Sequence, residues 1–171
     1  MLPLVATLFF ISCESNFNEV RKINITELNP VGEAQDFDLK YTDSGKIKAV
    51  LVSPQMLDYS HLEFPYTEFP KGIKVTIYDE KGNQSFVTSN YAISYSVSNL
   101  IDLRGQVTIT THDGKKLETE QLYYDQKNEW FFTQKNYKFT DKGNVINGEG
   151  IDFSKDFKHL DTQKINGVYS L

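Results

Sequence analysis

The stretch Leu117-x-Thr119-x-x-Leu122-x-Tyr124 decides the fold, because its pattern returns 29 residues later as Ile146-x-Gly148-x-x-Ile151-x-Phe153. Looser versions occur earlier, as Leu51-x-Ser53-x-x-Met56-x-x-Tyr59 and as Val87-x-Ser89-x-Tyr91. Each unit has an apolar segment, a small residue and a second apolar segment. A small residue suits a corner where a strand bends, and such units stack around a continuous apolar interior. The repeat therefore predicts stacked strands with bends at the small residues.

Turn residues separate the predicted strands. The segments Asp43-Ser-Gly45, Asp79-Glu-Lys-Gly82, Asp113-Gly114 and Asp141-Lys-Gly143 supply the positive-φ positions that tight hairpins require. Alternating segments such as Lys74-Val-Thr-Ile-Tyr78 lie between them, and no window keeps the apolar spacing of an amphipathic helix. We therefore expect residues 36–171 to form one all-β domain of antiparallel strands.

The composition excludes several functional classes. The chain has 171 residues, 39% of them apolar, which is enough for one sizeable core. The 23 acidic residues outnumber the 18 basic ones, which argues against nucleic acid as the main partner. A single cysteine cannot form an internal disulfide, a thiolate zinc site or an iron–sulfur cluster. We expect no cofactor and no metal.

The N-terminal segment has the pattern of a targeting signal. Residues 2–11 are uncharged and mostly apolar, but a membrane-spanning helix needs about 20 such residues. The sequence Phe10-Ile-Ser-Cys13 resembles a bacterial lipobox, in which the cysteine is lipidated and becomes the first mature residue. The alternative is a small buried cysteine in a core strand. The pattern favours a lipoprotein signal peptide at 1–12, lipidation at Cys13 and a polar tether at 13–35.

Several of these segments carry a resemblance to the periplasmic LptC family of lipopolysaccharide export, particularly to the lipoprotein-like form of Bacteroidetes-type bacteria. The resemblance covers about residues 36–169 and is carried by Tyr41-Thr-Asp-Ser-Gly-Lys46, Phe69-Pro-Lys-Gly-Ile-Lys-Val75, residues 113–125, Phe131-Phe-Thr133 and Ile146-Asn-Gly-Glu-Gly-Ile151. It implies an open, twisted β-jellyroll, like those of the LptA and OstA-like domains, which holds lipid acyl chains in an apolar groove without catalysis.

The resemblance also implies partners and a location. The expected ligand is lipopolysaccharide, which an inner-membrane ABC transporter of the LptB/LptF/LptG type delivers. An LptA-like bridge protein would receive it, with unpaired strand edges joining the domains. The protein would then lie on the periplasmic side of the inner membrane, held there by its lipid anchor.

Inward-facing positions of the repeats are the candidate groove residues. Acyl chains bind through buried area, so the expected ligand contacts are apolar rather than polar. Ordinary sandwich core is the alternative for each of them. Gly148 and Gly150 are expected to serve backbone geometry instead. The candidate acyl-chain contacts are Leu51, Met56, Tyr59, Val87, Tyr91, Leu117, Leu122, Tyr124, Phe131, Ile146, Ile151 and Phe153.

No enzyme motif stands out in the sequence. His61, His112 and His159 are far apart and lie beside turn residues. The acidic turns at 125–129 and 141–144 lack the alternating ligands of a calcium loop, and no nucleophile elbow occurs. We expect no catalysis. A second functional class stays open, namely a structural lipoprotein whose strands serve as a platform for partner proteins without carrying lipid.

Overall fold

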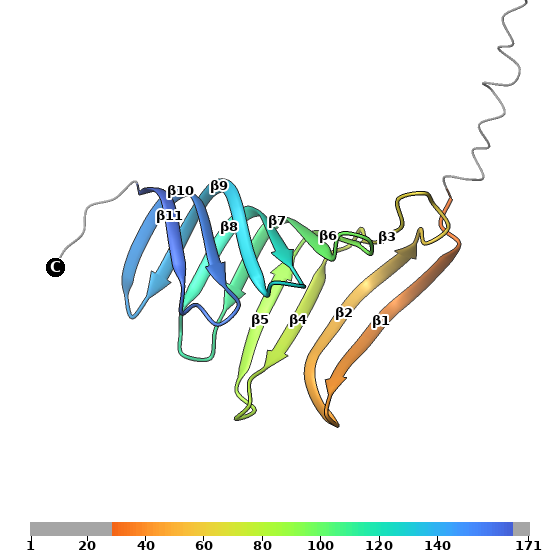
Figure 1. Ribbon diagram of the computed structural model, residues 1–171, viewed down its shortest axis with the longest axis horizontal. Helices are drawn as coiled ribbons and strands as arrows, with labels where there is room; N and C mark the ends of the chain where they lie inside the picture. The colour runs from red at the N-terminus through yellow and green to blue at the C-terminus, as the bar shows by residue number, and fades with distance from the viewer. Residues whose placement is uncertain (1–28, 166–171) are drawn as a thin grey trace, which may run out of the picture.

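The computed structural model describes residues 29–165 of the chain. This part contains eleven strands and no helix, so the predicted all-β class is confirmed (Figure 1). No helix among the described residues is long and apolar enough to cross a membrane. The predicted signal peptide, Cys13 and most of the predicted tether lie outside the described residues, as do residues 166–171.

The strands follow one another with short connections, and most neighbours in the chain pair directly. Their bounds are β1 Gly32–Asp43, β2 Lys46–Asp58, β3 Tyr66–Phe69, β4 Ile73–Tyr78, β5 Gln84–Ser89, β6 Tyr91–Tyr95, β7 Leu100–Thr110, β8 Lys116–Asp125, β9 Trp130–Asp141, β10 Asn144–Ser154 and β11 Leu160–Ile165.

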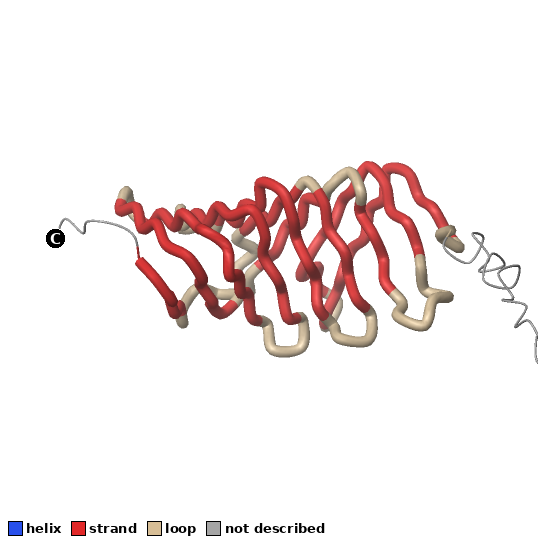
Figure 2. The backbone as a smooth tube through the Cα atoms, turned by 90° about the horizontal axis from the view of Figure 1, so that it is seen from above, coloured by secondary structure: helices blue, strands red, loops and turns tan. Residues whose placement is uncertain are grey.

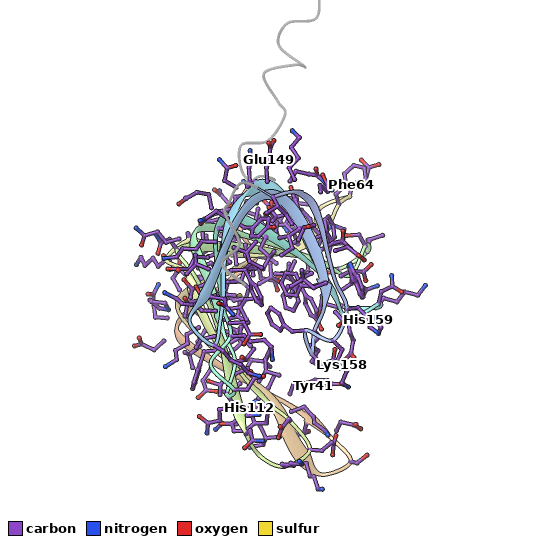
Figure 3. The ribbon with its side chains drawn as sticks, turned by 90° about the vertical axis from the view of Figure 1, so that its left-hand side faces the viewer. Tyr41, Phe64, His112, Glu149, Lys158 and His159 are labelled. Atoms are coloured by element: carbon purple, nitrogen blue, oxygen red, sulfur yellow. The ribbon has the colours of Figure 1, made fainter. Side chains whose placement is uncertain are left out.

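All eleven strands belong to one antiparallel sheet that folds over into two walls. The first wall comprises β1, the start of β2, β4, β5 and one half of each strand from β7 to β10. The second wall comprises the end of β2, β3, β6, β11 and the other halves of β7 to β10. Seen along the sheet, the strands arch from one wall to the other, with Glu149 at the ridge (Figure 3). The backbone has the form of an open, twisted β-jellyroll (Figure 2).

The strands bend where the sequence places small residues. The pairing register shifts between Thr119 and Tyr123 on β8 and between Glu149 and Ile151 on β10. Thr119 is buried at its bend and its hydroxyl donates to the Asn136 carbonyl at 2.9 Å. A threonine hydroxyl thus satisfies a carbonyl that the bend removes from the ladder. The predicted corner role of the small residues is confirmed.

Two glycines at the β10 bend serve different needs. Gly150 has a φ of +73°, which a residue with a side chain adopts only at a cost. Gly148 has no such angle, but a Cβ there would lie 2.3 Å from the Lys164 carbonyl oxygen of β11. Gly150 allows the bend, and Gly148 allows β11 to approach.

The fold begins earlier than the predicted domain boundary at residue 36. β1 starts at Gly32, and Ala34 pairs with Met56 of β2. The segment Gly32-Glu-Ala-Gln35 has little β-propensity, so its sequence resembles a linker. Pairing with the long strand β2, rather than propensity, makes it a strand.

Candidate functional site

A row of apolar side chains runs along the inner face of the first wall. Cross-strand pairing places one member on each of eight strands, and paired residues share a face of the sheet. The sequence thus builds a continuous apolar strip from strand to strand. Its members, in order across the sheet, are Leu39, Leu51, Val75, Val87, Ile109, Leu117, Phe139 and Ile146.

The strip is exposed at one end and buried in the middle. Leu39 on β1 is 52% exposed, whereas Leu117 on β8 is 1% exposed. Tyr41, two residues after Leu39 and therefore on the same face, is 62% exposed. Figure 3 shows Tyr41 toward the side on which the two walls do not meet. We define the open face as Leu39, Tyr41, Leu51, Val75 and Ile77.

The second wall supplies an aromatic lining opposite the buried part of the strip. Tyr124, Phe131 and Phe153 pair across β8, β9 and β10. Their rings stack with centroids 4.4 Å and 5.2 Å apart. These rings and the middle of the strip belong to a single hydrophobic cluster, so the walls interdigitate between β7 and β10. We call this region the closed core.

Ten of the twelve predicted groove residues face this interior. Six of them are buried members of the closed core, and four are partly buried side chains packed against it. The interior face that the repeat predicts therefore exists, although a lipid cannot reach its buried members while the walls stay packed. The six are Val87, Leu117, Leu122, Phe131, Ile151 and Phe153, and the four are Leu51, Met56, Tyr124 and Ile146.

Tyr59 and Tyr91 face the other side of the sheet, which corrects their predicted orientation. The Tyr91 hydroxyl donates to Glu68 at 2.7 Å, and the Arg104 guanidinium lies over its ring. Tyr59 stacks on Tyr66 with ring centroids 4.6 Å apart. Neither tyrosine belongs to the hydrophobic cluster.

The bend explains this error. In the well-formed repeats, Leu117 and Leu122 are both inward although they lie five positions apart, because the bend reverses the alternation. The same spacing from Val87 leads to Ala92, which is fully buried, and not to its neighbour Tyr91. A spacing of five would have identified the inward residue of this unit.

Sequence reasoning missed four members of the open face. The strands that carry them do not match the repeat, which was the main criterion. The alternation of residues 37–41 and 73–78 could have indicated them, since every second residue in both segments is apolar. They are Leu39, Tyr41, Val75 and Ile77.

Two hollows lie away from the open face. One, of about 730 Å³, lies on the outer side of the bends and has polar lining residues that include Asn90, Glu118 and Lys138. The other, of about 480 Å³, lies where β1 and β2 pass the start of β4 and includes Ser53 and Gly72. A polar outer groove does not suit an acyl chain, so we place the site on the open face instead.

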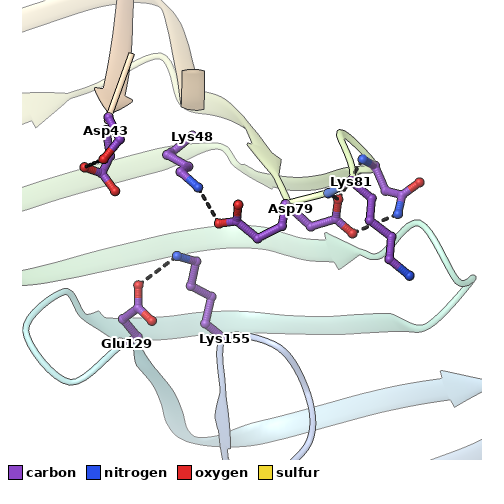
Figure 4. Close-up of polar contacts among 9 residues, drawn as sticks. Asp43, Lys48, Asp79, Lys81, Glu129 and Lys155 are labelled. Atoms are coloured by element: carbon purple, nitrogen blue, oxygen red, sulfur yellow. Dashed lines mark hydrogen bonds and ion pairs between the residues drawn. The ribbon is translucent and has the colours of Figure 1, made fainter. Parts of the chain in front are cut away.

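Two ion pairs lie near the hairpin tips, one on each wall. Lys48 pairs with Glu80 on the first wall, and Lys155 pairs with Glu129 at 2.8 Å on the second (Figure 4). Inside the second wall, burial raises the pKa of the Tyr124 phenol to about 12, so this ring is neutral at physiological pH. No group of side chains that could hold a metal ion occurs among the described residues.

Comparison with known proteins identifies the family. A family model described as "Lipopolysaccharide-assembly, LptC-related" matches residues 4–169. No protein with a curated description matches the chain. The family is one of periplasmic lipopolysaccharide transport and is not an enzyme family. With the model matching nearly the whole chain, and with a bent two-walled sheet whose apolar face is open at one end, this protein belongs to the LptC family.

Proposed function

We propose that this protein carries lipopolysaccharide through the periplasm by holding its acyl chains on the open face. An inner-membrane ABC transporter delivers the lipid, and an LptA-like jellyroll receives it. The observation that carries the proposal is the exposure of Leu39 and Tyr41 at the end of a strip whose middle is buried. A solvent-exposed apolar face that continues into an apolar interior is a binding surface for an apolar ligand.

The energetics suit lipid tails. Burial of apolar surface contributes about 25 cal/mol per Å², so a few acyl chains lying across the open face bind without a polar anchor. The negative charge of the chain does not oppose this arrangement, since the lipid phosphates stay outside with the hairpin tips. The mixed charges at those tips, such as the Lys48–Glu80 pair, leave no strongly repulsive rim.

Partner contacts are proposed for the two outer edges of the sheet. Within residues 29–165, β1, with twelve residues, pairs only with β2, and β11, with six residues, pairs only with β10. Each therefore has backbone groups available to a strand of another chain. The transporter and the bridge protein would attach at these two edges.

Anchoring at Cys13 is part of the proposal. Lipidation at the lipobox-like sequence would tether the β-domain to the inner membrane through residues 13–31. Mass spectrometry of the mature protein should find an N-terminal cysteine that carries acyl groups. A mature chain that still contains unmodified Cys13 within a longer N-terminus would refute the anchor but not the lipid-binding face.

Photocrosslinking tests whether the protein is a carrier or only a platform for other proteins. A benzophenone side chain at position 39, on the open face, should give lipopolysaccharide adducts in cells. The matched probe at position 52 is on the outer face of the neighbouring strand, where Val52 is 39% exposed. It should give few. Adducts to proteins at both positions, without lipid at position 39, would favour the platform.

A further inference from the structure

Phe157 occupies an unusual position in the loop between β10 and β11. Its φ is +57°, a backbone conformation that is a rare outlier for a bulky aromatic residue. The loop is tight, since the Phe157 amide donates to the Ser154 carbonyl at 2.8 Å and the Ser154 amide donates to the His159 carbonyl at 3.0 Å. Such a conformation persists only where other contacts compensate for it.

The compensating contacts join the two walls. The Phe157 ring stacks on Phe153 of the second wall with centroids 4.5 Å apart and an interplanar angle of 26°. It also stacks on Phe139 of the first wall at 6.0 Å and 14°. Phe139 is a member of the apolar strip, and Phe153 belongs to the aromatic lining opposite. Phe157 therefore spans the interior from one wall to the other.

The loop that carries Phe157 is held by contacts near the surface. The Lys155 amide donates to the Glu129 carbonyl at 2.9 Å, and the Lys155 ammonium pairs with the Glu129 carboxylate at 2.8 Å (Figure 4). Lys158 and His159 of the same loop lie at the tip of the second wall (Figure 3). Partly exposed ion pairs contribute little, so this loop can detach without unfolding the sheet.

At the opposite end of the strip, Phe37 of β1 meets Phe69 of β3 with ring centroids 6.0 Å apart, but the strip continues past this contact to Leu39 and Tyr41. Leu39 and Tyr41 are more than half exposed, whereas toward the β9–β10 end the ring of Phe157 packs on Phe139 of the strip. We infer that Phe157 is a stopper: by packing on both walls it holds the β9–β10 end of the closed core shut, so acyl chains reach that end of the strip only when its loop swings out. This inference rests on the proposed function, because it concerns how far along the strip the same ligand can move.

The test compares lipid access at the two ends of the strip in the full-length chain. Benzophenone is placed at position 39 on the open face or at position 146, where the half-buried Ile146 ends the strip beyond Phe139. Purified lipopolysaccharide is the ligand. With Phe157 present, adducts should form mainly at position 39. In Phe157→Gly they should rise several-fold at position 146 and stay unchanged at position 39.

Glycine is chosen because it tolerates the positive φ, so the loop keeps its course while the ring is lost. Lys158→Ala, at the next position and with a side chain 77% exposed, is the matched control and should behave like the unaltered protein. Circular dichroism on heating verifies that each variant is folded. Should Phe157→Gly fail to fold, Phe157→Asn, which also removes the ring and tolerates the positive φ, takes its place with the same expected rise.

The outcomes separate the two proposals. Absence of lipid adducts at both positions in every variant refutes the proposed function itself. If adducts form at position 39, but those at position 146 do not increase when Phe157 is replaced, the stopper is refuted and lipid binding stands. Strong adducts at position 146 with Phe157 in place also refute the stopper.

Discussion

Replacing Gly72 by alanine is expected to lower the free energy of unfolding by about 3 kcal/mol or more. Gly72 has a φ of +81°, and the left-handed region costs an L-residue about 1–2 kcal/mol. A Cβ there would lie 2.3 Å from the Ser89 carbonyl oxygen, a backbone atom that cannot rotate away. Forcing such a contact adds about 1–3 kcal/mol.

Gly82→Ala is the matched control. Gly82 has a similar φ of +83° in the β4–β5 hairpin, but no atom lies within 4 Å of its would-be Cβ. Gly82→Ala should lower the free energy of unfolding only by the cost of the positive φ, about 1–2 kcal/mol. Urea unfolding monitored by circular dichroism measures both variants. Equal losses for the two would show that β5 does not approach Gly72 as closely as the structure has it.

Replacing both Leu39 and Tyr41 by aspartate should weaken lipopolysaccharide binding by a factor of about 100. Loss of an apolar contact of this size costs about 1.5–3 kcal/mol, and each 1.4 kcal/mol is a tenfold change in affinity. Carboxylates on the open face would also have to lose water against the acyl chains. Because both side chains are more than half exposed, the stability of the variant should change by less than about 1 kcal/mol.

Val52→Asp is the control that tests whether binding depends on the open face or only on added negative charge. Val52 is adjacent to Leu51 on β2 but belongs to the outer face, where it pairs with Lys74. Binding measured by fluorescence titration should be unchanged in this variant. Equal loss of affinity in the two variants would mean that added negative charge, rather than the open face, governs binding.

The architecture was predictable because hairpin chemistry and the repeat are local signals. The glycines at 45, 82, 114 and 143 all have positive φ in tight turns, as their sequence context predicts. The repeat at 117–124 and 146–153 correctly marks two bends and the inward residues around them. Such features depend on a few neighbouring residues, so one sequence suffices to find them.

The open face was not predictable in the same way. Leu39 and Leu117 are both leucines in alternating strands, and only their tertiary surroundings make one exposed and the other buried. Exposure depends on which strands lie opposite, and this is decided by pairing between distant segments. The error at Tyr91 is different: the spacing of five in the well-formed repeats leads from Val87 to Ala92, but the unit at Val87 is loose because the chain there ends one strand and begins another.

Four consecutive strands that run through both walls, β7 to β10, give the molecule an uneven stiffness. From β7 to β10 the same chain crosses the ridge four times, so the walls are joined covalently and move as one body. Toward β1 only β2, paired along its length with β1, joins the walls in this way, and the strands beside it, β3 to β6, are short and separate. Under the proposed function, the β1 end would be the part of the sheet that can widen to take a ligand, while the β7–β10 end keeps the register of the strands.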